Sequence, residues 1–398
     1  MASHFETNSS NRSAVPASSS SFGIRFDRNE LSGAFGDLGT DLPLIVGVIL
    51  ASGLDAPSVL IMFGLMQILS GLMYGLPMPV QPLKAMAVIV ISQKVSPDIL
   101  YGGGLGIGIT MLVLSATGLI DWLARIVPKN VIRGIQFGLG MQLALLALKD
   151  YIQSDGVLGY ALAVLSFTIT LFLLGNRKYP PALILVMLGV LYASAIKANA
   201  LDIFAGIGFH LPAIRVPTID AILTGWLLLA LPQLALSLGN SILATKQVIE
   251  DLFPGYPISV RKISWTYSVM NLINPFLSGY PTCHGSGGIA GHFAFGARTG
   301  GSVVIEGTLY LILGLFFGPG FEHVVQIFPR PMLGVILLFE AITLIRLVRD
   351  MTDSKTDFTI VIMVGLIAIG LPYGYVLGIL AGTIVAYMAQ GGLTRLGE

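Results

Sequence analysis

Long apolar segments, separated by short polar ones, fill this chain of 398 residues from about residue 30 to its end. The residues are 54% hydrophobic and only 11% charged, whereas a typical soluble domain has about 25% charged residues. Inside a bilayer every backbone polar group needs a partner within the protein, and a helix supplies it. The sequence therefore predicts an all-α polytopic membrane protein surrounded by a lipid bilayer.

Helices of about 20 apolar residues are long enough to cross a bilayer, and this length gives about fourteen candidate segments. In the first half they lie at 33–52, 55–75, 80–93, 100–121, 129–149, 157–175 and 179–197. In the second half they lie at 221–243, 263–278, 284–294, 299–318, 330–348, 357–371 and 373–391. The third and tenth segments are too short to cross alone, so we expect two short broken helices.

The two halves of the chain share features that indicate a repeat. A proline opens a helix that ends in Lys149-Asp150, and about 200 residues later a proline opens one that ends in Arg349-Asp350. Seven helices per half make the second half enter from the opposite side, so the predicted repeat is inverted, 7+7, as in alternating-access carriers. The predicted units are a disordered cytoplasmic tail (1–29), a first repeat (30–201), a connector (202–220) and a second repeat (221–393).

The basic residues predict an orientation. With the N-terminus inside, this arrangement puts sixteen Lys and Arg residues on the cytoplasmic side and five on the other, with Lys84 at membrane depth. This asymmetry agrees with the positive-inside rule. We therefore expect both termini in the cytoplasm and the cell (inner) membrane as the host membrane. The net charge of +1 indicates no nucleic-acid partner.

Two polar breaks, Pro79–Lys84 and Pro281–Gly288, interrupt the apolar sequence about 200 residues apart. Irregular backbone at membrane depth is tolerated only where it is buried in protein or lines a cavity, and a matched pair of breaks indicates a transporter's binding site. We expect Pro82 to open one helix and Ser286 to cap another, with the two helix N-termini pointing at each other. Each N-terminus offers unpaired N–H donors and about half a positive charge, so the pair is suited to an anion.

The predicted substrate-binding residues lie in these breaks and on the eighth helix. They are Gln81, Lys84, Thr282, Cys283, His284, Gly285, Ser286 and Gly287, with Gln233 and Asn240. Lys84 either meets the anion or forms a structural pair with Asp37, because a buried lysine needs a partner. Glycines let a ligand approach the amides closely. The single cysteine excludes an internal disulfide and a cysteine-based metal site, and we expect no metal and no cofactor.

Four acids in apolar segments are candidates for proton coupling. Asp37 and Asp41 are four residues apart on one helix face, where two like charges favour protonation of one of them. Glu306 and Glu340 are the other two, because ionisable groups at membrane depth are costly and tend to serve function. Each of the four also has a structural interpretation, as a cap or as a hydrogen bond between helices.

These motifs resemble those of the molybdate transporter family, a branch related to the sulfate permeases. The resemblance covers nearly the whole chain from about residue 30, and the segments that carry it are Gly33–Thr40, Pro77–Lys84, Cys283–Gly288 and Phe295–Gly300. It implies a high-affinity oxyanion importer, a homodimer, and a core domain and a gate domain each built from both repeats. The chain departs from the expected pattern at Leu83 and His292, and neither change removes a donor group.

The sequence thus predicts a secondary active transporter, not an enzyme, that imports a tetrahedral oxyanion, with molybdate as the substrate and protons as the coupling ion. A sulfate or nucleobase carrier of the same fold is the alternative, although a nucleobase site would favour a carboxylate where Gln233 and Asn240 lie. A channel is another alternative. An intramembrane hydrolase is the last, suggested by Cys283-His284, but no acid lies near this pair and no G-x-S-x-G motif surrounds it.

Overall fold

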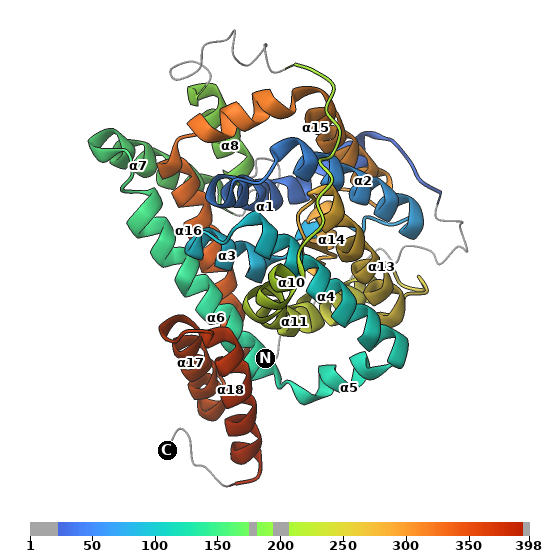
Figure 1. The fold of residues 1–398 in the computed structure, drawn as a ribbon, viewed down its shortest axis with the longest axis vertical. Coiled ribbons are helices and arrows are strands. Elements are labelled where there is room, and N and C mark those ends of the chain that lie inside the picture. The colour runs from blue at the N-terminus through green and yellow to red at the C-terminus, as the bar shows by residue number, and fades with distance from the viewer. Residues whose placement is uncertain (1–22, 175–180, 194–206, 393–398) are drawn as a thin grey trace, which may run out of the picture.

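Helices built from the apolar segments make up nearly all of the structure (Figure 1). The computed structural model describes residues 23–174, 181–193 and 207–392. Most of the predicted tail (1–29) therefore lies outside the described residues, and the predicted connector (202–220) is described only in part. The prediction of a helical membrane protein is confirmed.

The first half contains ten helical or strand elements among the described residues. In chain order these are α1 (Arg28–Ser52), α2 (Ala56–Tyr74), β1 (Gln81–Pro82), α3 (Lys84–Gln93), α4 (Pro97–Thr117), α5 (Leu119–Ile126), α6 (Lys129–Leu146), the π-helical η1 (Ala147–Tyr151), α7 (Gly156–Leu173) and α8 (Pro181–Tyr192).

The second half begins with one long helical rod made of several pieces. These are α10 (Ile219–Gly225), η3 (Trp226–Ala230), α11 (Leu231–Leu236), η4 (Ser237–Ala244) and α12 (Thr245–Leu252). The rest are α13 (Val260–Ile273), η5 (Asn274–Leu277), β2 (Thr282–Cys283), α14 (Ser286–Ala294), α15 (Gly301–Ile327), α16 (Arg330–Arg346), η6 (Leu347–Met351), α17 (Lys355–Gly370) and α18 (Gly374–Gln390).

Each predicted apolar segment has a helix at its place, but several boundaries differ. Gly118 adopts a left-handed conformation (φ 73°) that ends α4, a common role of glycine at a helix C-terminus, so the segment 100–121 divides into α4 and α5. Pro82 does not open α3, because it pairs within β1 and the helix starts at Lys84. Gly285, and not Ser286, is the N-cap residue of α14.

Five helices are both long and apolar enough to cross a membrane on their own. Within the described residues these spans are Ala56–Tyr74, Pro97–Thr117, Lys129–Tyr151, Gly156–Leu173 and Gly301–Gly318. The count of fourteen membrane segments and the 7+7 repeat stay predictions. The rod from α10 to α12 is divided into pieces, and each piece is too short to cross a membrane on its own.

The helices of the two halves pack against each other reciprocally. The second helix, α2, lies along α15, and its counterpart by position, α13, lies along α4. Similarly, α1 contacts α14, while α11 contacts α3. An exchange of partners of this kind is what a two-fold relation between the halves would produce, so it supports the predicted inverted repeat.

Close backbone contact holds the α2–α15 pair together. A Cβ atom at Gly64 would lie 2.6 Å from the carbonyl oxygen of Gly307, and one at Gly307 would lie 2.7 Å from the carbonyl oxygen of Gly64. Small residues are the usual means by which membrane helices approach closely. The first group of helices, α1–α4 with α10–α15, is therefore tightly packed.

A second group of helices consists of α6, α16, α17 and α18, with α7 packed along α16. Figure 1 shows the α17–α18 pair at the lower end of the molecule, away from α2 and α15. The two groups correspond to the predicted core and gate domains, a division that stays a prediction.

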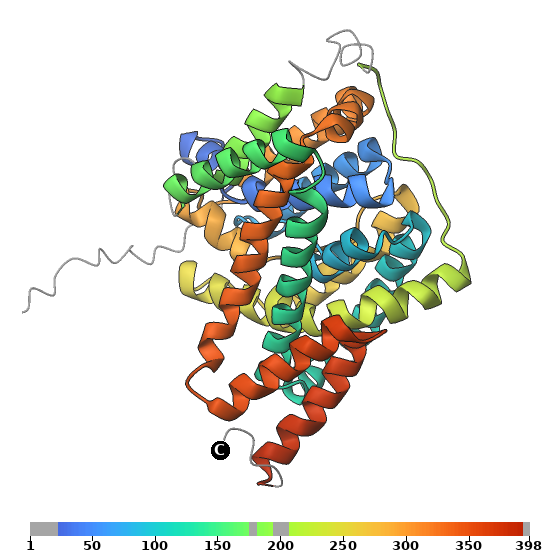
Figure 2. The same ribbon diagram turned by 90° about the vertical axis from the view of Figure 1, so that its left-hand side faces the viewer.

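The described part of the connector, residues 207–218, has an extended backbone and runs along the outside of the first group (yellow-green in Figure 2). Its amides find partners on helices that it passes: Gly208 N donates to Phe316 O (3.1 Å) and Arg215 N donates to Phe276 O (2.9 Å). These bonds attach the connector to α15 and to η5.

Candidate substrate-binding site

The structure brings the two polar breaks together in the middle of the first helix group. Strands β1 and β2 pair in antiparallel fashion, with Gln81 opposite Cys283 and Pro82 opposite Thr282. The amide of Leu83 extends the pairing by donating to Pro281 O at 3.1 Å. As a result α3 and α14 begin side by side, one from each half of the chain.

Amide side chains from α13 and from η5, which follows it, hold the second break in place. The Asn271 carboxamide accepts from Thr282 N (2.9 Å) and donates to Thr282 O (2.7 Å). One turn further on, Asn274 donates to Tyr280 O (3.0 Å) and to the Thr282 hydroxyl (3.1 Å). These groups are buried, so each bond supplies a partner that irregular backbone would otherwise lack in the membrane.

The first break is fixed in the same way by α2. The Gln67 carbonyl accepts from Val80 N at 2.8 Å, and the Ser70 hydroxyl donates to Met78 O at 2.6 Å. Sequence analysis did not single out Gln67, Asn271 or Asn274. The sequence feature that could have revealed them is an amide side chain in the apolar segment that precedes each polar break.

The N-terminus of α3 is capped by Gln233, which we had predicted to line the cavity. Its carbonyl oxygen accepts from Ala85 N (2.9 Å) and from Met86 N (3.3 Å). Its amide group donates to the Ser237 hydroxyl at 3.0 Å, and Gln233 is 1% exposed. The first turn of α3 therefore has a neutral protein acceptor, and Lys84, its first residue, is half-buried.

The N-terminus of α14 is more open. Its N-cap residue, Gly285, has no side chain that could cap it, and Gly287 is exposed. A Cβ atom at Gly287 would have no heavy atom within 4 Å, whereas one at Gly288 would lie 2.3 Å from Oδ2 of Asp37. One at Gly285 would lie 1.5 Å from Oε1 of Gln81. The first turn of α14 thus has protein on one side and open space on the other.

Asp37 and Gln81 form the buried wall behind this turn. The Gln81 amide group donates to both carboxylate oxygens of Asp37, at 2.6 and 2.7 Å. Asp41 is also buried. Lys84, Asp37 and Asp41 all lie within electrostatic range of the Cys283 thiol, so these predicted residues form one cluster.

His284 points away from the open turn. Its Nδ1 atom lies 3.1 Å from Pro79 O and its Nε2 atom lies 2.8 Å from the Thr266 hydroxyl. The ring also makes an edge contact with Tyr74, with ring centres 5.3 Å apart. Both ring nitrogens are occupied by protein partners in this conformation. The side chains of Asn240 and Glu340 lie outside the part of the molecule that the structure describes.

A second buried polar cluster lies between α14 and α15. The Nε2 atom of His292 is 3.3 Å from Oε2 of Glu306, and both side chains are fully buried. The distance suits an ion pair, but the pair does not meet hydrogen-bond geometry, and the Tyr310 hydroxyl has no hydrogen-bond partner among the described residues. Asp37 is within electrostatic range of both His292 and Glu306. This cluster is therefore continuous with the wall of the site.

Glu30, another residue that sequence analysis missed, caps α15. Its carboxylate accepts from the backbone amides of Arg298 and Thr299 (both 2.9 Å) and of Ser302 (3.0 Å). A carboxylate at a helix N-terminus is favourable because of the helix dipole. The only sequence feature that could have drawn attention to Glu30 is its position just before the first apolar segment.

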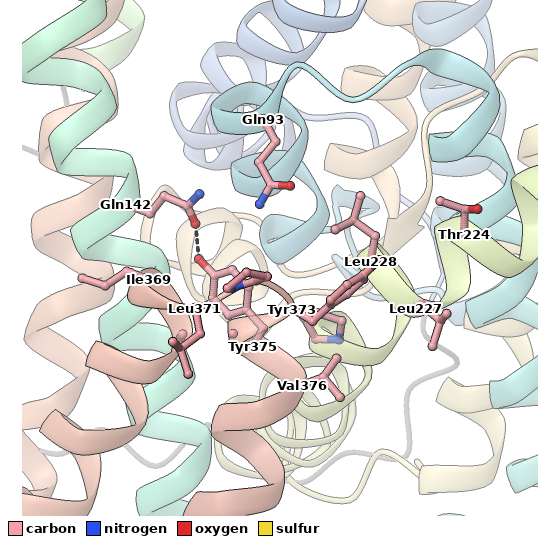
Figure 3. A pocket seen from close by; sticks show the side chains of 14 residues that line it. Gln93, Gln142, Thr224, Leu227, Leu228, Ile369, Leu371, Tyr373, Tyr375 and Val376 are labelled. Atoms are coloured by element: carbon pink, nitrogen blue, oxygen red, sulfur yellow. Dashed lines mark hydrogen bonds between the residues drawn. The ribbon is translucent and has the colours of Figure 1, made fainter.

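A cavity of about 340 Å³ lies at the other end of α3, and none of the predicted substrate-binding residues lines it. Figure 3 shows Gln93 of α3 and Gln142 of α6 facing the turn between α17 and α18, with Gln142 bonded to the Tyr375 hydroxyl. Gln142 also donates to Ser92 Oγ at 2.6 Å. The bond to Ser92 connects the two helix groups, whereas the bond to Tyr375 lies within the second group.

The fold of this helical membrane protein is similar to folds known from solved transporter structures. The transmembrane domain of a cyanobacterium bicarbonate transporter, BicA, is similar with a TM-score of 0.66 at 17% identity, covering 91% of this chain and 98% of that chain. The murine Slc26a9 anion transporter in the inward-facing state gives a TM-score of 0.70 at 12% identity, covering 93% and 69%.

The sequence comparisons identify the family. The model described as "Molybdate transporter of MFS superfamily" matches residues 29–143 and 225–344. Molybdate transporter 2 of Arabidopsis thaliana is 33% identical over 383 residues, covering 84% of this chain and 82% of that one. Molybdate transporter 1 of Chlamydomonas reinhardtii is 26% identical over 476 residues. This chain belongs to the molybdate transporter family, which confirms the resemblance, and it is a transporter, not an enzyme.

Proposed function

We propose that this protein is a secondary active transporter that imports molybdate, bound as an oxyanion at the first turn of α14. The observation that carries the proposal is the open space at Gly287, in the first turn of α14 just after an N-cap glycine, which has no side chain of its own to cap the helix. Backbone amides at such a terminus favour an anion whose charge is spread over several oxygens. The names of the relatives supply molybdate as the substrate.

The geometry divides the predicted site residues into two sets. Ser286, Gly287 and Lys84 are only partly buried at the start of α14 and α3, and we propose that they contact the anion. The others form the structure behind them: Gln81, Gln233, Thr282, Cys283, His284 and Gly285. Asn240 stays a predicted contact. Because Gln233 already occupies amides of α3, we propose that α14 contributes more of the binding free energy than α3.

We also propose proton coupling through the buried acids. A dianion that enters against a negative interior needs compensating charge, because each elementary charge costs about 2.3 kcal/mol per 100 mV. Asp37 and Asp41 lie at the wall of the site, and the His292–Glu306 pair lies next to them. We therefore propose Glu306 as a proton carrier, with its partner His292 as a second group that exchanges the proton. Glu340 stays a candidate.

For the transport cycle we propose movement of the first helix group against the second. The bond from Gln142 to Ser92 links the two groups at one end of α3, while Gly287 in the first turn of α14 is exposed. Access from one side at a time follows if this bond breaks when the site opens to the other side. We further expect a homodimer in the cell (inner) membrane with cytoplasmic termini.

The test is isothermal titration of the purified protein with molybdate and then with sulfate. Gly287→Leu should abolish molybdate binding, because its side chain would fill the open space without displacing protein atoms. Gly370→Leu is the matched control, since Gly370 also has no heavy atom within 4 Å of a Cβ position and lies at the end of α17. Tight molybdate binding by a folded Gly287→Leu variant would contradict the proposed site. Tighter sulfate than molybdate binding would make this a sulfate carrier.

A further inference from the structure

A groove of about 590 Å³ opens between α2 and α13, and the buried His284, just after β2, is among the residues that line it. Its apolar walls carry Leu69, Met73, Val269 and Ile273, which are 41–57% exposed. The volume is in the range of sites that hold an organic ligand. In a membrane protein, apolar walls this exposed face lipid chains.

One end of this groove is positively charged. Arg261 and Lys262 line it at the start of α13, next to Ser259, and no acid is among the groove's lining residues. The ammonium of Lys262 lies 4.7 Å from the centre of the Tyr74 ring and 5.9 Å from that of Tyr256. The groove therefore has an apolar body and a cationic end. Positive charge at the edge of a membrane attracts anionic lipid headgroups.

We propose that this groove binds one anionic phospholipid, with its phosphate at Arg261 and Lys262 and an acyl chain along Leu69, Met73 and Val269. The separation of charge and apolar surface matches the two parts of such a lipid. Trp265, which also lines the groove, is of the amphipathic type that favours the boundary between headgroups and chains. The positive-inside rule places Arg261 and Lys262 in the cytoplasmic leaflet, where anionic lipids concentrate.

The groove is connected to the substrate site through hydrogen bonds. Tyr74, in its wall, bonds to the Thr266 hydroxyl at 2.6 Å, and Thr266 bonds to His284 Nε2 at 2.8 Å. His284 in turn holds Pro79 O, just before β1. A bound lipid would therefore contact side chains that hold the first polar break in place.

Native mass spectrometry of the full chain tests the lipid directly and does not depend on transport. The detergent-purified protein is incubated with phosphatidylglycerol or phosphatidylcholine of the same acyl length, and retained lipid is counted. We expect one retained phosphatidylglycerol and preference over phosphatidylcholine. Arg261→Gln/Lys262→Gln should weaken retention about 30-fold, while the control Arg349→Gln/Lys355→Gln, which changes two exposed basic residues elsewhere, should not change it.

A steric variant tests the groove itself. Val269→Trp should lower retention because its ring would occupy the groove, and a normal unfolding temperature shows that this variant is folded. Equal retention of both lipids, or unchanged retention in Arg261→Gln/Lys262→Gln, would overturn the proposal. Displacement of the lipid by glycerol phosphate alone would overturn the role of the acyl chain. A dimer that Val269→Trp disrupts without change in lipid retention would assign the groove to a second copy.

Discussion

Replacing Gln233 by leucine should destabilise the protein, because two amides of the first turn of α3 would lose their acceptor. Gln233 Oε1 accepts from Ala85 N at 2.9 Å and, less favourably, from Met86 N at 3.3 Å, with 1% of the residue exposed. Leaving a buried donor unsatisfied costs about 1–3 kcal/mol. Counting the longer bond as weaker, we expect Gln233→Leu to lower the free energy of unfolding by about 2–4 kcal/mol.

The assay is equilibrium unfolding of the purified protein in mixed micelles, followed by tryptophan fluorescence. Gln247→Leu is the control: it makes the same change further along the same helical rod, at an exposed site where Gln247 bonds only to Asp251, and should stay within about 0.5 kcal/mol of wild type. A Gln233→Leu variant as stable as this control would show that the cap contributes nothing.

Gln233→Glu separates stability from anion binding. The carboxylate keeps an acceptor for Ala85 N and places a negative charge at a helix N-terminus, where it is favourable, so stability should be retained. Molybdate affinity should fall at least 30-fold, because two unit charges 8 Å apart repel by about 2 kcal/mol at an effective dielectric constant of 20. Unchanged molybdate affinity would place the anion away from α3 and α14.

Three further predictions concern other parts of the molecule. Gln142→Leu removes the bond to Ser92 and should increase labelling of a cysteine introduced near Gln93 from the side of the Figure 3 cavity; unchanged labelling would argue against a gate there. Glu306→Gln should abolish uptake driven by a pH gradient in proteoliposomes while molybdate counterflow continues, and gradient-driven uptake at the wild-type rate would exclude Glu306 as proton carrier. Partial burial raises the pKa of Asp350, but hydrogen bonds from Arg133 and Lys129 outweigh it and hold that pKa below its usual 3.8. Its stabilising contribution should therefore be complete well above pH 3.8 and be lost as pH falls through the lowered pKa, so Asp350→Asn should lower the unfolding temperature at pH 7 and lower it less and less as the pH falls below 3.8.

The helices and the family could be predicted from the sequence because both depend on local patterns. Apolar segments give helices wherever the backbone must satisfy itself in lipid, and the two polar breaks could be recognised as a pair by their spacing alone. The count of membrane spans is less accessible, because a helix such as α3, with 10 residues, is too short to be recognised as a span by its length.

The roles of individual site residues were harder to predict, because they depend on where side chains from the other half arrive. Nothing near Gln233 in the sequence indicates that it caps α3, a helix about 150 residues earlier. Likewise, His284 was predicted as a donor to substrate from its place in the break, yet the pairing of β1 with β2 turns its ring toward Thr266 and Pro79.

The pairing of β1 with β2 has a mechanical consequence. The two strands are joined by backbone hydrogen bonds, and buried amide side chains bind the backbone at both ends of the pair. We therefore expect the N-termini of α3 and α14 to move together and not to separate from each other. The substrate would then move within a site of fixed width, formed by the starts of α3 and α14, while the helices around that site change position. We expect this site to discriminate between anions of different radius to the same degree when it binds and when it releases them. The selectivity should therefore be the same from whichever side of the membrane it is measured.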